Sequence, residues 1–296
     1  MKSTRHDRTP NAVSLFFLLF FISFFLVNLP GCSRTSSAQT DPQADYSAAV
    51  NDARTMSAAK ITKNLTAITA GNTNLKWEND VPGSRVLVAT YINYQPACEG
   101  YTSPDGTGCK VGQECKNYGY SSWVTVVPEL KNLLGTAPAL LRVIQALGLP
   151  PPSNTQTLDN TCILELYVSP GDLFRPSPDP EITDQEAELS FPLDGFRKFD
   201  DTRLVWSEMP CDTSRCPSCQ SGKCGFTTYK NWFDNRKAHV YDLSTPYPWT
   251  ALGYTYDWGN PTAPHIGLSE FVINPGSGGV PVFIKSVNWT RDYFTN

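Results

Sequence analysis

Hydrophobic and polar positions divide the chain into an apolar N-terminal segment and a longer part with the periodicities of folded structure. From Ala12 to Val27 the residues are almost all apolar, and Lys2, Arg5 and Arg8 precede them. A basic start followed by an apolar run is the layout of an export signal. We therefore assign residues 1–31 to a signal peptide that is not part of the fold.

Several later segments are rich in β-forming residues, and the clearest of them alternate apolar and polar positions with the period of two typical of strands. The predicted strands are 85–94, 123–127, 162–168, 203–206, 266–273 and 280–287. The last two are separated only by the glycine-rich segment 274–279. This spacing predicts that they pair as a hairpin.

Helical periodicity is found in two stretches, and a third helix is predicted from its cap. In the stretch 46–68, Ile61, Leu65 and Ile68 follow the i, i+4, i+7 spacing of one helical face. A second helix is predicted over 129–147, kinked or divided at Pro138. A short third helix follows Thr227, which can cap it.

The order of these elements lacks the regular βαβ rhythm of a parallel sheet, so the sequence predicts an α+β fold. We expect a single domain over residues 46–296 with a mostly antiparallel sheet, two or three helices and disulfide-stapled loops. Residues 32–45 are polar and without periodicity, which is typical of a flexible tether. The proline-rich run 175–180, with the acidic stretch after it, predicts an extended surface excursion.

The end of the apolar segment reads Leu29-Pro30-Gly31-Cys32 and resembles the lipobox of bacterial lipoproteins. The resemblance implies that Cys32 carries a lipid and anchors the chain in a membrane of the cell envelope. Ser33 in place of aspartate then implies the outer membrane. Two alternatives stay open: cleavage after Ala38, which would release a secreted or periplasmic protein, and retention of the apolar segment as an anchor. All three place the domain outside the cytoplasm.

Cysteine usage agrees with export. Eight cysteines remain besides Cys32: Cys98, Cys109, Cys115, Cys162, Cys211, Cys216, Cys219 and Cys224. An even set in an exported protein predicts disulfides. The alternative is that Cys211, Cys216 and Cys219, whose spacing is that of metal ligands, hold zinc or a [2Fe–2S] cluster. Cys224 would then be the fourth thiolate.

Charge and motifs narrow the range of functions. The formal net charge is −4 and the pI is near 5.4, which argues against a nucleic-acid partner. The chain has no phosphate-binding glycine motif and no H-E-x-x-H motif, so we expect no cofactor and no metal site. The expected partners are the membrane, through the lipid, and an envelope component or partner protein.

The segment 248–259 is the most distinctive part of the chain, and it resembles uncharacterised exported bacterial proteins, a resemblance that implies no activity. It holds Trp249, Tyr254, Tyr256 and Trp258. Such side chains combine flat apolar faces with polar tips and suit binding of a sugar or protein partner. The same spacing is also typical of aromatic residues that fill a core.

Three residues in the same region could supply acid–base chemistry: Asp257, His265 and Glu270. Two carboxylates at a suitable separation would fit glycoside hydrolysis. The sequence favours a non-catalytic binding or interaction protein. The alternative is an envelope-directed hydrolase or toxin-like enzyme that uses these carboxylates.

Overall fold

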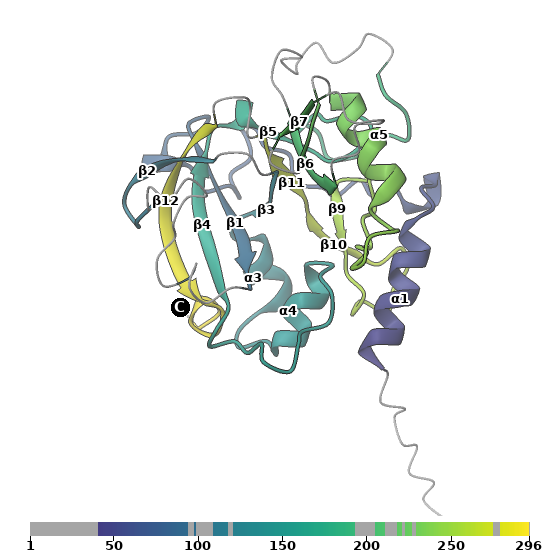
Figure 1. Ribbon diagram of the computed structural model, residues 1–296. Helices are drawn as coiled ribbons and strands as arrows, with labels where there is room; N and C mark the ends of the chain where they lie inside the picture. Colours follow the sequence, from purple (N-terminus) through teal and green to yellow (C-terminus); the bar gives the residue numbers. More distant parts are fainter. Residues whose placement is uncertain are drawn as a thin grey trace, which may run out of the picture. The chain divides into compact units, whose positions relative to one another are not determined.

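A seven-stranded sheet forms the centre of the fold in the computed structural model of the chain (Figure 1). Across the sheet the strands follow the order β2 (Glu114–Asn117), β12 (Val280–Trp289), β4 (Cys162–Val168), β1 (Val86–Ile92), β3 (Ser122–Val126), β11 (Phe271–Ile273) and β5 (Leu173–Phe174). Every pairing in this sheet is antiparallel. The structure describes residues 41–93, 98, 109–117, 121–192, 205–210, 218–220, 223–226, 229–274 and 279–295.

Two smaller sheets and several helices accompany the large sheet. One small sheet pairs β9 (Tyr254–Tyr256) with β10 (Ile266–Ser269), and the other has the order β6 (Val205–Pro210), β8 (Lys223–Phe226), β7 (Ser218–Gln220). The α-helices are α1 (Pro42–Ala53), α3 (Glu129–Leu134), α4 (Leu140–Ala146), α5 (Tyr229–His239) and α6 (Thr290–Tyr293). Short 3₁₀ turns lie at Ala58–Lys60, Glu78–Asp80 and Pro170–Asp172. The α+β class is therefore confirmed, with five α-helices in the described residues where two or three were expected.

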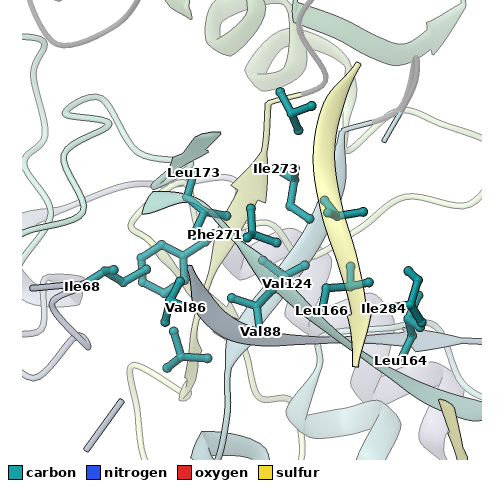
Figure 2. Close-up of a cluster of buried hydrophobic side chains, with 14 of the residues drawn as sticks. Ile68, Val86, Val88, Val124, Leu164, Leu166, Leu173, Phe271, Ile273 and Ile284 are labelled. Atoms are coloured by element: carbon teal, nitrogen blue, oxygen red, sulfur yellow. The ribbon is translucent and has the colours of Figure 1, made fainter. Parts of the chain in front are cut away.

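The two faces of the large sheet carry separate groups of buried side chains. On β1, Val86 and Val88 belong to one group and Leu87 and Ala89 to the other, as the alternation of a strand requires. Figure 2 shows the first group, in which Phe271 packs with the valines. The second group includes residues of α3, α4 and α6, so these helices cover the opposite face.

Most predicted strands are confirmed, but the predicted hairpin is wrong. The strands predicted at 85–94, 123–127 and 162–168 are present as β1, β3 and β4. The segment 266–273 divides at Glu270 into β10 and β11, and β11 pairs with β3 and β5. The following strand, β12, pairs instead with β4 and β2, so β4, β1 and β3 lie between the two expected partners.

The predicted helix over 46–68 is also wrong in its second half. The side chain of Asp41 accepts a hydrogen bond from the Gln43 backbone N–H at 3.0 Å and so caps α1, which ends at Ala53. The helix therefore begins inside the region that we assigned to the tether. The segment from Ile61 to Ile68 is extended, because its backbone bonds to residues 182–185.

The predicted helix over 129–147 is present as two helices. The break covers residues 135–139 and contains Pro138. Gly135 stands at the end of α3 with a φ of +65°, a conformation that glycine adopts without steric cost. The last predicted helix is confirmed as α5, while Thr227, its expected cap, lies outside the described residues.

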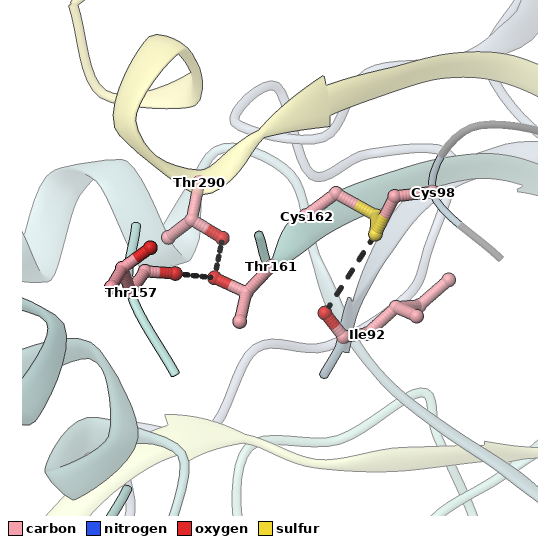
Figure 3. The surroundings of a disulfide bond; sticks show 6 residues. All are labelled: Ile92, Cys98, Thr157, Thr161, Cys162 and Thr290. Carbon is pink, nitrogen blue, oxygen red and sulfur yellow. Dashed lines mark hydrogen bonds between the residues drawn. A yellow bond between two sulfur atoms is a disulfide. The ribbon is translucent and has the colours of Figure 1, made fainter. Parts of the chain in front are cut away.

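Two disulfides are present in the described residues, which confirms part of the predicted framework. They join Cys98 to Cys162 and Cys109 to Cys115. Figure 3 shows the first of these at the start of β4, next to the hydroxyl of Thr161. That hydroxyl donates to Thr157 O at 3.0 Å and lies 2.8 Å from the hydroxyl of Thr290, the first residue of α6. The disulfide therefore closes a long loop onto a rigid part of the sheet.

The remaining four cysteines of the predicted framework are only partly described. Cys219 on β7 and Cys224 on β8 are Cα partners in the small sheet, while Cys211 and Cys216 lie outside the described residues.

Candidate functional site

A pocket of about 380 Å³ lies beside the large sheet, and its lining includes Val124, Leu164 and Leu166 of the group shown in Figure 2. Its wall is formed by β1, β3 and β4, by the residues after α4, by α5 and by β9. Its aromatic lining includes Trp123, Trp249, Tyr254 and Tyr256. We call this the aromatic pocket. Its size and apolar walls are those of a small-molecule site.

The packing of α5 explains the position of the aromatic wall. Trp232 and Phe233 of α5 lie against Trp249, with ring centroids 6.4 Å and 5.2 Å away. Arg236 follows Trp232 by one turn and therefore faces the same side of the helix. Its guanidinium lies 4.2 Å from the centroid of the Trp123 ring and 5.6 Å from that of Trp249. One face of α5 therefore places the Arg236 guanidinium over the indole rings of Trp123 and Trp249.

Among the polar atoms of pocket-lining residues, several are buried without a hydrogen-bond partner in the described part of the chain. They include Oε2 of Glu270, Nε1 of Trp123 and Nε1 of Trp249. An unsatisfied buried polar atom costs about 1–3 kcal/mol, so a native protein rarely keeps several together. All three of these atoms are enclosed within the pocket wall, where solvent does not reach them.

Glu270 is the carboxyl group of the pocket. It stands between β10 and β11, and its backbone N–H donates to Gly253 O at 2.9 Å. Burial disfavours the charged carboxylate and raises the pKa of Glu270 to about 8, while the positive charge of Arg236 opposes that shift. At neutral pH the group is therefore mostly a neutral carboxylic acid, which can donate a hydrogen bond.

A second buried carboxyl, Glu129, has its hydrogen bonds satisfied. It accepts from the backbone N–H and the hydroxyl of Ser269, both at 2.9 Å, and from the hydroxyl of Thr125 at 3.1 Å. Burial raises the pKa of Glu129 as well, and these hydrogen bonds oppose the shift. Glu129 ties α3 to β10 and β3, whereas Glu270 beside it keeps an oxygen without a partner.

The four aromatic residues proposed for binding are buried. Trp249, Tyr254, Tyr256 and Trp258 are only 4%, 1%, 5% and 8% exposed, so they pack in the core and form no exposed stacking surface. Three of them still line the aromatic pocket. Trp258 does not line it; its indole N–H donates to Leu149 O at 3.0 Å and its ring packs on Tyr46.

The structure does not bring Asp257, His265 and Glu270 into one site. The carboxylate of Asp257 is 1% exposed and pairs with both terminal nitrogens of Arg142, at 2.8 Å and 2.6 Å. The ring of His265 stacks on Tyr256, and its Nδ1 lies 2.6 Å from Asn260 O. Of the three, only Glu270 lines the aromatic pocket.

Other kinds of site are not found in the described part of the chain. None of its helices combines the length and apolar character needed to cross a membrane. No group of three or more histidine, cysteine or acidic side chains is placed there to hold a metal ion. The zinc or [2Fe–2S] alternative depends on Cys211 and Cys216, which the structure does not describe.

Comparisons with known proteins add no relative. No family model matches the chain, and neither the curated proteins nor the solved structures contain a match. The geometry of the pocket therefore carries the functional proposal.

Proposed function

We propose that this chain is an exported, lipid-anchored binding protein of the bacterial cell envelope, and that its domain holds a small molecule in the aromatic pocket. The export signal and the lipobox-like segment ending at Cys32 support the location. One observation carries the binding role: about 380 Å³ of space is lined by the aromatic residues Trp123, Trp249, Tyr254 and Tyr256.

Binding is favoured over hydrolysis by the separation of the two carboxylates. Glycoside hydrolysis requires two carboxyl groups that flank the same bond. Asp257 is bound to Arg142 and does not line the pocket, so Glu270 would act without its proposed partner. A single carboxyl among aromatic walls suits recognition of a ligand.

Calorimetric titration of the mature protein with indole tests the pocket, because indole is neutral and matches its aromatic walls. We expect saturable binding of one molecule. A Leu149→Trp variant should abolish it by filling the pocket, whereas Leu133→Trp, at an exposed position outside the pocket wall, should bind normally. Absence of indole binding to the native protein would contradict the proposed role.

Intact-mass measurement of the mature protein from its native envelope tests the anchor. A chain that starts at Cys32 and carries the mass of attached acyl chains is the expected result. A chain that starts at Gln39 would indicate ordinary secretion, and an uncleaved chain would indicate a membrane anchor.

A further inference from the structure

Building on the proposed function, we infer that the aromatic pocket takes a small uncharged aromatic molecule and excludes charged analogues of either sign. The inference goes beyond the presence of a binding site, since it names the chemical class that the site prefers. Three features of the pocket wall support it: the apolar lining, the binding of its hydroxyl groups to the protein, and the enclosure of its two charged residues.

Aliphatic and aromatic side chains form most of the pocket wall. Val124, Leu164 and Leu166, which Figure 2 labels among the core residues, contribute aliphatic surface. Trp123 and Leu149 also line the pocket, and each keeps part of its surface exposed. Removal of such apolar surface from water favours binding and requires no charge on the ligand.

The aromatic residues of the wall are held in place by contacts with other rings. Trp123 and Trp249 meet edge to face, with their centroids 6.2 Å apart and their planes at 84°. Tyr256 stacks on His265 at a centroid distance of 4.9 Å. Aromatic rings prefer edge-to-face and offset-stacked neighbours, so a flat ligand ring can make further contacts of the same kind. The wall therefore favours an aromatic ligand over an aliphatic one.

Three hydroxyl groups of lining residues are bound to the protein. The hydroxyl of Tyr254 donates to Lys60 O at 2.8 Å, and that of Tyr256 donates to Asp52 Oδ2 at 3.1 Å. Neither acceptor lines the pocket. The hydroxyl of Thr255 donates to a backbone oxygen of α4 at 2.6 Å. The two tyrosines therefore offer the pocket their ring surface, while their polar tips are occupied elsewhere.

The charged residues of the wall are largely enclosed. Arg236 and Glu270 are the only ones among the described residues that line the pocket. Arg236 is 6% exposed, and its guanidinium packs over the rings of Trp123 and Trp249, while solvent does not reach Oε2 of Glu270. A ligand ammonium or carboxylate would lose its hydration without meeting an exposed counter-charge. Burial of a charge is costly under these conditions, so the wall disfavours both signs.

Calorimetry at pH 7 with four probes that share one ring system tests the exclusion of charge: indole, 3-ethylindole, indole-3-acetate and tryptamine. The last two match 3-ethylindole in shape but carry a negative and a positive charge. We expect 3-ethylindole to bind at least as tightly as indole, and both charged probes to bind about tenfold or more weakly than 3-ethylindole.

The outcomes of this comparison are distinct. Binding of either charged probe as tight as that of 3-ethylindole would overturn the inference. Binding of 3-ethylindole as weak as that of the charged probes would also overturn it, because size would then explain the exclusion. If indole itself does not bind, the proposed function fails.

A second pair of probes tests the preference for an aromatic ring. Benzyl alcohol and cyclohexylmethanol are both neutral and soluble, and they differ in whether the ring is aromatic. We expect benzyl alcohol to displace indole at about a threefold lower concentration than cyclohexylmethanol does. Equal or tighter binding of cyclohexylmethanol would overturn the preference for an aromatic ligand.

A charge placed in the wall tests the cause of the exclusion. Leu149→Lys adds a cation to the lining and should raise the affinity for indole-3-acetate, relative to 3-ethylindole, by about tenfold. Leu133→Lys, at an exposed position outside the wall, is the matched control and should keep the native ratio. Thr90→Lys repeats the test from β1 if the first variant does not fold. An unchanged ratio in a folded variant of the wall would overturn the inference.

Discussion

Removal of the Cys98–Cys162 disulfide is expected to lower the free energy of unfolding by about 4 kcal/mol. The bond joins residues 64 positions apart, so its loss returns a large conformational entropy to the unfolded chain. Its Cys162 end is fully buried at the start of β4, a strand with neighbours on both sides. Denaturant unfolding of the Cys98→Ala/Cys162→Ala variant, followed by circular dichroism, measures the effect.

The second disulfide provides the matched control. Cys109 and Cys115 are only six positions apart, so the same reasoning gives a loss of about 2 kcal/mol for Cys109→Ala/Cys115→Ala. If the short-loop variant lost as much stability as the long-loop variant, restriction of the unfolded chain would not be the main effect of these bonds.

The strands that sequence reasoning placed correctly are those whose own side chains report their environment. In β4 the positions of Ile163, Leu164 and Leu166 are all buried, yet the polar Glu165 between them still marks the period of two. The local pattern was sufficient to predict this strand, because successive side chains of a strand point to opposite faces of the sheet and so show the period of two directly in the sequence.

Strand pairing could not be obtained in the same way. The glycine-rich segment after Ile273 resembles a hairpin turn, but β11 and β12 are separated by three strands. Which strand lies next to which depends on long-range packing, and here β4, β1 and β3 share with β11 and β12 the core face in Figure 2. A turn motif specifies a hairpin only where its two strands have no better partners.

The segment around Arg175 shows a second limit. The proline-rich run was expected at the surface, yet Arg175 is 1% exposed. Its guanidinium pairs with Asp184 and donates to the backbone oxygens of Asp184 and Glu186. A Cβ at Gly253 would lie 2.5 Å from the Arg175 Cδ, so glycine is required for this close approach. Composition suggested exposure because a charged residue is rarely buried without such partners.

The aromatic pocket was predictable only in part. The sequence drew attention to Trp249, Tyr254, Tyr256 and Glu270, and all four line the pocket. Trp123 and Arg236 were missed, because Trp123 lies far from this segment in sequence and the two side chains meet only when α5 packs beside β3. The single available signal was the spacing of Trp232 and Arg236 on one helix face.

Replacement of Asp257 by asparagine is expected to destabilise the fold by about 3 kcal/mol. The Asp257 carboxylate is 1% exposed, and it also accepts from Gly259 N at 3.0 Å. The neutral variant leaves the Arg142 charge without its counter-ion, although that side chain is 33% exposed and so recovers part of its hydration. Denaturant unfolding of Asp257→Asn measures the loss.

The pair between Lys230 and Asp234 is the matched control, since both side chains are about half exposed on α5. Asp234→Asn should change stability by less than about 0.5 kcal/mol, as is usual for a solvated pair one helical turn apart. A structural role of Asp257 also predicts that indole binding survives in Asp257→Asn wherever the protein stays folded. Full stability of Asp257→Asn together with loss of a hydrolytic activity would instead give Asp257 the catalytic role that its ion pair with Arg142 argues against.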